Sequence, residues 1–316
     1  MRGILSYHWV VRPLALAFLC CACAHIGQRS DLDTACDAAR KERIAGHWDE
    51  AIRHLQPPLE EARRRGRTDA EARLLNELGQ AQAERAIRRG ENTGPALATF
   101  ERARVVATGL GDRKLLAAAI DGAGMVFYWQ TLLSMRNDWD DAMSRFRDAL
   151  ALRDDPRDRA ASEFHIGLVH QMRGETQEAA QAFARAQKLA EKAGDPIELS
   201  STLRHQADLA FKQGDLVKAR MLHHRSLALR EQAGFTVGIA NAHISLSHLE
   251  DPEPHLFQAL GLCDQIGDEL TRAEAELAWA QLRNDKSHAR RALEAARKTH
   301  DVETEQAAEK LLAATQ

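Results

Sequence analysis

The chain has 316 residues, of which 28% are charged and 44% hydrophobic, and its formal net charge is −3. Glycine and proline number only 19 and 8, and aromatic residues make up 5%. This composition favours helix throughout, argues against a β-sandwich or barrel, and holds enough apolar residues for a packed core. The nearly balanced charge gives no electrostatic drive toward nucleic acid, so no nucleic-acid partner is expected.

The first 24 residues differ in composition from the rest of the chain. Arg2 and Arg12 are their only formal charges, and residues 14–24 form an unbroken apolar run. That run is too short to cross a bilayer as a helix, because a span needs about 20 residues. A positive start, a short apolar run and small residues at Ala22 and Ala24 are typical of a secretory signal peptide cleaved after Ala24. We therefore expect a signal peptide at 1–24, a linker at 25–30 and export across a bacterial inner membrane; an uncleaved anchor is the alternative.

A lipid anchor is a second possibility for this segment. The stretch 19–23 resembles a bacterial lipoprotein signal, and Cys23, which follows Ala22, is the candidate for lipidation. The motif's apolar residue lies one position too far upstream, at Leu19, with Cys20 in its place. Modification at Cys23 would hold the protein at the cell envelope, whereas cleavage after residue 24 would release it into the periplasm.

A pattern of spacings recurs along the remainder of the chain. In four copies a small residue precedes a glycine by 15 positions: Ala51/Gly66, Ala96/Gly111, Ala179/Gly194 and Ala219/Gly234. Bulky residues follow the small residue of the second helix by four positions, as Phe183 follows Ala179. This spacing puts both on one helical face, as closely packed antiparallel helical hairpins require. A closing Gly-Asp pair, as in Gly111-Asp112 and Gly267-Asp268, suits the end of one helix and the start of the next.

Two stretches of these copies match a known motif. Leu78-Gly79 and the segment 46–51 (GHWDEA) resemble the tetratricopeptide repeat, which places a Leu-Gly pair in its first helix and G-x-[YW]-x-x-A at the entrance to its second. The unit of about 40 residues is similar to the extended subtype of cell-polarity adaptors, kinesin light chains and bacterial peptide-sensing regulators. The resemblance implies an all-α fold, an α-solenoid of about seven hairpins over residues 31–301 with a capping helix at 302–316.

The units are not identical. Their second helices centre on Ala51, Ala96, Ala142, Ala179, Ala219, the stretch 252–259 and the stretch 289–292. Units two and three carry extra residues between their helices, at 89–94 and 134–138, and unit six is shortened at 251–254. Cys36 and Cys263 lie near opposite ends of an array expected to be elongated, so we expect both to be free thiols.

The sequence offers no constellation for catalysis. It contains no glycine-rich phosphate loop, no H-E-x-x-H and no G-x-S-x-G. His165 and His170 are five apart, which turns them about 140° apart on a helix, so they are poorly placed to share a metal. His223 occupies the bulky position that Phe183 holds one unit earlier, so we expect it in the core. We expect no enzyme activity, no catalytic residue, no metal ligand and no cofactor.

The resemblance also implies a binding surface, because the first helix of each unit lines the inner groove of a tetratricopeptide superhelix. The positions expected to face this groove are Tyr128, Trp129, Phe164, His165, Arg204, His205, Asp208, Phe211 and Lys212. Aromatic and arginine side chains carry a large share of protein-binding energy, so a protein or peptide ligand is predicted here. The alternative is that Tyr128, Trp129 and Phe211 pack against neighbouring helices. A non-enzymatic interaction scaffold is the leading functional hypothesis. The alternative is a peptide-responsive regulatory or sensor module that acts on a separately encoded partner.

Overall fold

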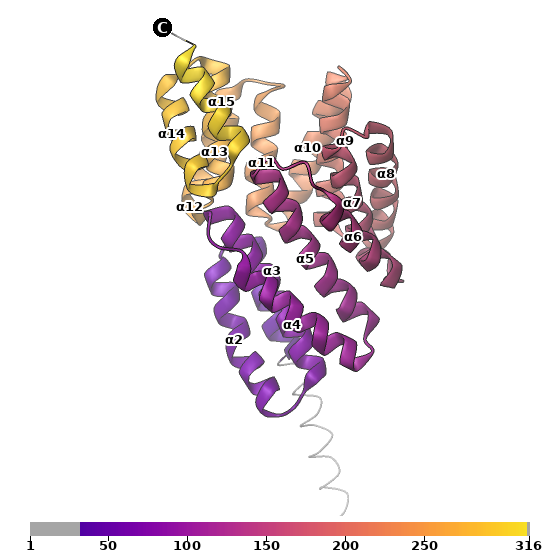
Figure 1. Ribbon diagram of the computed structural model, residues 1–316. Coiled ribbons are helices and arrows are strands. Elements are labelled where there is room, and N and C mark those ends of the chain that lie inside the picture. Colours follow the sequence, from indigo (N-terminus) through magenta and orange to yellow (C-terminus); the bar gives the residue numbers. More distant parts are fainter. Residues whose placement is uncertain (1–31, 315–316) are drawn as a thin grey trace, which may run out of the picture.

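The protein is described by a computed structural model that covers residues 32–314 (Figure 1). Helix is the only regular secondary structure in that range. The predictions of a signal peptide at 1–24, a linker at 25–30 and a modified Cys23 concern residues outside the described range, and they stay predictions.

A helix at 32–44 begins the described chain and fourteen further helices follow it. Their bounds are α2 (Trp48–Arg64), α3 (Thr68–Arg89), α4 (Gly94–Leu110), α5 (Arg113–Leu133), α6 (Asp140–Leu152), α7 (Pro156–Met172), α8 (Thr176–Ala193), α9 (Pro196–Lys212), α10 (Leu216–Ala233), α11 (Thr236–Ser247), α12 (Pro252–Ile266), α13 (Glu269–Arg283), α14 (Lys286–Thr299) and α15 (Val302–Ala313). Helix 32–44 pairs with α2, and the hairpins α3–α4 to α13–α14 follow as units two to seven. The prediction of an all-α solenoid with seven hairpins and a final capping helix is confirmed.

The hairpins of units two, three and four close where a glycine of the first helix meets a phenylalanine ring of the second. A Cβ added at Gly167 in α7 would lie 2.5 Å from the ring of Phe183 in α8. The equivalent distance is 2.8 Å from Gly124 in α5 to Phe146 in α6. Any larger side chain would therefore force the two helices apart, which explains why the repeat keeps a glycine or alanine at this position.

Helix ends follow the Gly-Asp pattern of the sequence. Gly111 adopts a left-handed conformation at φ +67° and ends α4, and the carboxylate of Asp112 accepts the N–H of Leu115 at 2.9 Å. Asp268 caps α13 in the same way by accepting the N–H of Thr271 at 3.0 Å. These caps satisfy backbone groups that a helix end leaves unpaired.

The array curls until its last two units touch its first three units (Figure 1). Helices α13 and α14, near the yellow end of the chain, pack against α3 near its indigo end. Leu270 at the start of α13 joins an apolar cluster with Ile87 of α3 and Val126 of α5, and all three are buried. We call the surface where units six and seven contact units one to three the seam.

Unit one takes part in the seam through two residues near the start of α2. Trp48 is fully buried and packs with Val237 and Ile266 of unit six. A Cβ on Gly46 would lie 2.8 Å from Ile266, and the φ of Gly46 is +87°. Only glycine fits this position, because any side chain would clash with Ile266 and would strain the left-handed backbone. Cys36 and Cys263 are both buried free thiols. Free thiols were expected at both positions, but the reason, an elongated array with distant ends, is wrong because the solenoid closes.

Candidate functional site

Two of the residues expected to face the groove lie instead in the core. Tyr128 and Phe164 are 5% and 8% exposed. The Tyr128 ring packs against Trp139 with centroids 5.4 Å apart, and Phe164 packs against Phe183 at 5.9 Å. Their burial leaves little of either ring available to a ligand, so the expectation of exposed anchors at these two positions is corrected to a packing role.

Trp129 lies at the seam. Its ring is partly buried beside the cluster that contains Ile87 and Leu270, and the guanidinium of Arg88 lies 5.1 Å from the ring centroid. Unit seven therefore covers the part of the inner surface that Trp129 was expected to expose.

His165 belongs to a buried charge cluster between units three and four. Its Nδ1 lies 3.0 Å from Oδ2 of Asp121, whose other oxygen accepts a hydrogen bond from Arg153 at 3.2 Å. Burial acts to raise the pKa of Asp121, but His165 and Arg153 outweigh it and lower this pKa to about 2. The carboxylate is therefore ionised and paired, which gives the cluster a structural role.

The remaining inner positions form a polar group on units four and five. Arg204 Nη2 lies 2.7 Å from Nε2 of His205, and Nδ1 of the same ring lies 2.8 Å from Oε1 of Gln171. Arg204 also donates to Oδ2 of Asp208 at 3.4 Å, and His223 Nε2 lies 3.6 Å from Oδ1 of Asp208. We call these five residues the inner polar cluster.

His205 holds the inner polar cluster in place as a neutral ring. Arginine can only donate, so Nε2 accepts from Arg204 while the opposite nitrogen, Nδ1, donates to the Gln171 oxygen. Burial, reinforced by Arg204, lowers the pKa of His205 well below its usual value, in agreement with this tautomer. The ring also stacks on Phe183 with centroids 5.5 Å apart. Its partly exposed neighbours Arg204 and Asp208 are therefore fixed in orientation.

The inner polar cluster presents one cation and one carboxylate to the inside of the solenoid. The side chains of Arg204 and Asp208 keep 28% and 24% of their surface exposed. His223 is 3% exposed and lies in the core, as expected, and burial lowers its pKa to about 4. Phe211 and Lys212, at the end of α9, are exposed. The structure thus brings Arg204, His205 and Asp208 together at a partly exposed position, and the buried ring of Phe164 packs against His205 with centroids 5.4 Å apart.

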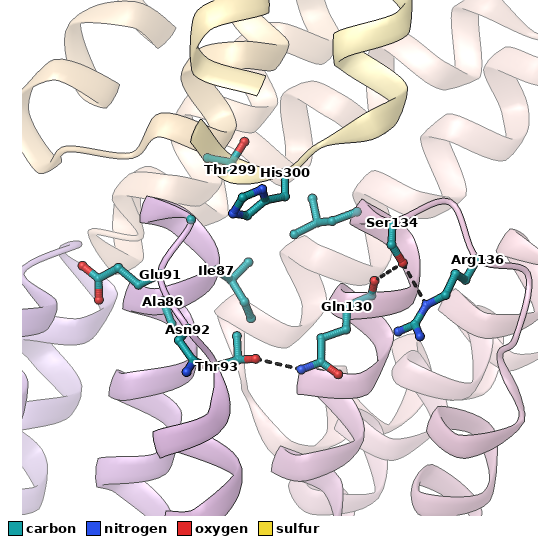
Figure 2. A pocket seen from close by; sticks show the side chains of 12 residues that line it. Ala86, Ile87, Glu91, Asn92, Thr93, Gln130, Ser134, Arg136, Thr299 and His300 are labelled. Carbon is teal, nitrogen blue, oxygen red and sulfur yellow. Dashed lines mark hydrogen bonds between the residues drawn. The ribbon is translucent and has the colours of Figure 1, made fainter. Parts of the chain in front are cut away.

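A pocket of about 420 Å³ lies at the seam (Figure 2). Its walls come from three distant parts of the chain, and the lining residues are Ala86, Ile87, Gly90, Glu91, Asn92, Thr93, Gln130, Leu133, Ser134, Arg136, Thr299 and His300. The side chain of Gln130 crosses the pocket and donates a hydrogen bond to the Thr93 hydroxyl at 2.7 Å. The sequence predicts extra residues at 89–94 and 134–138 but gives no sign that they meet the loop after α14.

Comparisons with known proteins support the architecture. No protein-family model matches the chain, and no curated protein matches it. The solved Cut9–Hcn1 hetero-tetramer of APC/C matches at 15% identity over 87% of this chain, with a TM-score of 0.50. That match covers 54% of the Cut9–Hcn1 chain, so this protein spans about half its length.

Two other solved structures are similar. BtubC from P. vanneervenii has 16% identity over 75% of this chain and 93% of its own, with a TM-score of 0.47. Aspartyl phosphate phosphatase F from Bacillus subtilis has 14% identity over 80% of this chain and 72% of its own, also with a TM-score of 0.47. The chain has a tetratricopeptide-repeat-like fold.

The described residues were also compared with the requirements of a membrane-spanning helix and of a metal site. None of the helices between residues 32 and 314 combines the length and apolar character that crossing a membrane requires. In the same range, no three His, Cys, Asp or Glu side chains are placed to hold a metal ion.

Proposed function

We propose that the protein is a non-enzymatic scaffold that binds a protein or peptide at the inner polar cluster. The observation that carries this proposal is the fixed pair of Arg204 and Asp208, which His205 orients on the inner face of α9. A guanidinium and a carboxylate held in one orientation offer a donor fork and an acceptor to a peptide, at a reduced entropic cost of ordering. Phe211 adds an exposed apolar side chain one turn further along the helix.

The similar fold of Cut9, which was solved as a hetero-tetramer with Hcn1, supports a role in protein assembly. The inner helices of a solenoid form a continuous concave surface, which suits an extended or helical segment of a partner. In this chain Arg204 and Asp208 of unit five stay partly exposed on that surface, whereas unit seven covers it at units two and three. The binding segment is therefore expected to be short, about two units in length.

Binding at the inner polar cluster is tested by two charge changes and a matched control. Arg204→Glu reverses the cation, and Asp208→Lys reverses the carboxylate. Arg225→Glu changes an arginine of the same unit on the outer helix α10. Proteins that copurify with the wild type and with Arg225→Glu but not with Arg204→Glu or Asp208→Lys are the expected partners. Equal retention by all four proteins would remove the inner polar cluster as the binding site.

The proposal includes export, for which the support is the signal-like sequence at 1–24. Mass spectrometry of the protein expressed in a Gram-negative host reads this directly. A first residue of His25 in the periplasm is the expected result, and a lipid-modified Cys23 in the membrane fraction would assign the lipoprotein form. An intact Met1 in the cytoplasm would contradict export.

A further inference from the structure

The pocket at the seam has an apolar floor and a polar rim, and we call it the seam pocket. Ala86 and Ile87 of α3 are 4% and 6% exposed, and Leu133 at the end of α5 lies partly buried beside them. Arg136 and His300 stand at the rim, where both are exposed. A volume of about 420 Å³ is within the range of small-molecule sites. The floor can therefore bury the apolar part of a small molecule while the rim contacts its polar part.

The walls of the seam pocket include residues that the repeat fold does not need. In units four and five the two helices are joined by short linkers at 173–175 and 213–215. Unit three has the longer linker 134–139 at the same place, and in unit two α3 extends to Arg89 before the linker 90–93. Residues of both longer connections line the seam pocket. The extra chain thus forms the pocket, whereas other hairpins of the same fold close without it.

His300 has a backbone conformation that glycine adopts more easily. The outer helices α4, α8, α10 and α12 each end at a glycine in the left-handed conformation. The outer helix α14 ends instead at His300, with φ +58°. A side chain in this conformation is strained, and strain of this kind concentrates at functional sites. The imidazole lines the seam pocket, so contact with a bound molecule would account for a histidine at this position.

Arg136 supplies an unpaired cation at the rim. Its Nε donates to Oγ of Ser134 at 3.1 Å, and that hydroxyl donates to the carbonyl oxygen of Gln130 at 2.6 Å. The guanidinium is thereby held at the end of α5, and it forms no ion pair with any residue between 32 and 314. Glu91 also lines the pocket, but it pairs with Arg85 at 3.0 Å and points away from the other lining side chains in Figure 2. The charge left for a ligand is therefore positive.

The C-termini of α3, α5 and α14 meet at the seam pocket, and a bare helix C-terminus favours a cation. The chain itself caps these three ends. The N–H groups of Gly90 and Glu91 both bond to the carbonyl oxygen of Ala86. The N–H of Asp301 bonds to the oxygen of Ala296 at 3.0 Å, and the serine hydroxyl described above caps α5. Since these carbonyl groups are occupied, the full charge of the guanidinium decides which ligand the pocket prefers.

We propose that the seam pocket binds a small organic anion, with its apolar body on the floor and its carboxylate at Arg136. The two Nη groups of this guanidinium are free to form a charge-assisted pair with a carboxylate. His300 contacts the body of the ligand from unit seven. Because the walls belong to units two, three and seven, the ligand binds only when the seam is closed, and it stabilises the closed solenoid. The seam pocket is separate from the inner polar cluster, so this inference does not rest on the proposed scaffold function.

The probe is 3-phenylpropionate, with 3-phenylpropan-1-ol and 3-phenylpropylamine as neutral and cationic molecules of the same shape. Calorimetry measures the affinity, and the methyl NMR signal of Ile87 shows whether the seam pocket is occupied. Arg136→Gln removes the charge, and Arg147→Gln, at an exposed arginine of α6 without an ion pair in the described chain, is its control. His300→Gly removes the ring and relieves the backbone. Asn284→Gly, at φ +53° at the end of α13, relieves the backbone elsewhere and is the second control.

We expect the acid to bind the wild type with a Kd of about 1 mM and to raise its melting temperature. The alcohol and the amine should bind about tenfold more weakly. Arg136→Gln should bind the acid and the alcohol equally, whereas Arg147→Gln should keep the preference for the acid. His300→Gly should melt no lower than the wild type and yet bind the acid about tenfold more weakly. Asn284→Gly should bind the acid as the wild type does.

Four results would overturn the proposal. The wild type does not bind the acid in preference to the alcohol, or Arg136→Gln keeps that preference. His300→Gly binds the acid as tightly as the wild type does. The acid binds but leaves the methyl signal of Ile87 unchanged, which would place it elsewhere on the protein.

Discussion

Arg88 in α3 donates a hydrogen bond of 3.2 Å to the hydroxyl of Thr271 in α13, across 183 positions of sequence. The same guanidinium lies 3.9 Å from Oδ2 of Asp268 and covers the ring of Trp129. One side chain therefore joins units two, three and seven. The carboxylate of Asp268 is fully buried, so Arg88 is also the cation that balances its charge.

Replacing Arg88 with alanine should open the seam. The change leaves Asp268 buried without its cation, and the expected loss in free energy of unfolding is about 2–4 kcal/mol. Small-angle X-ray scattering should show a larger radius of gyration, and hydrogen exchange should become faster in α3 and α13. Arg104→Ala, which removes an exposed arginine that pairs only with Glu101 three residues earlier, is the control. A compact Arg88→Ala protein of unchanged stability would contradict the role of Arg88.

Gly90 gives a second test of the seam, with an internal reference. Gly66 and Gly90 both have a left-handed backbone, at φ +64° and +70°. A Cβ at Gly90 would lie 2.0 Å from the carbonyl oxygen of Lys298, whereas at Gly66 it would meet no described atom within 4 Å. Gly66→Ala should cost only the strain of that backbone, about 1–2 kcal/mol. Gly90→Ala should cost clearly more and should separate unit seven from unit two. Equal melting temperatures for the two variants would show that the approach of Lys298 does not matter.

The buried cluster of Asp121, His165 and Arg153 should make the free energy of unfolding fall at low pH. Its lowered pKa of about 2 means that the carboxylate favours the folded state above pH 3.8 and loses this contribution as the pH falls toward 2. Asp121→Asn should cost about 3–5 kcal/mol at pH 7, because Arg153 is then buried without a carboxylate, and the deficit should shrink near pH 2. Urea unfolding across this range checks both statements. Asp141→Asn, at an exposed position, should show neither effect.

Glu198 should have the opposite effect and lower the free energy of unfolding as the pH rises. Burial raises its pKa from 4.5 to about 7, and its Oε1 is buried without a hydrogen-bond partner in the described chain. The folded protein keeps a proton that the unfolded chain releases, so this group lowers stability as the pH rises from 4.5 to 7. Glu198→Gln should therefore be more stable than the wild type at pH 8, with the difference disappearing below pH 4.5. Denaturation midpoints at both pH values test this, and Glu178→Gln at an exposed position is the control.

The sequence predicts the packing and capping contacts within a hairpin, because the residues that make them lie at fixed short spacings along the chain. The approach of Gly167 to Phe183 is of this kind, and so is the cap that Asp268 forms. In unit five, Ala207 stands where unit four has Gly167, and His223 stands where unit four has Phe183. A larger residue on the first helix is thus paired with a smaller ring on the second. The number and order of helices follow from this repeating local logic.

The candidate site was only partly predictable. Counting along α9 placed Arg204 and Asp208 at an exposed inner surface, since that surface depends on one helix and its neighbour. The same counting failed for Tyr128 and Phe164, whose burial depends on how tightly successive inner helices pack. It also could not foresee that unit seven covers Trp129. Closure results from small rotations between successive units, and the repeat spacings leave those rotations open.

A solenoid with free ends can gain or lose a repeat at little cost, since each unit meets only its neighbours. Here an inserted hairpin would carry Thr271 past Arg88 and bring the wrong loop to Gly90. A deleted hairpin would leave the two partners out of reach of each other. Single residues of this protein can therefore be substituted during evolution, whereas the number of hairpins is fixed. The two ends of the solenoid meet only when the array contains seven hairpins.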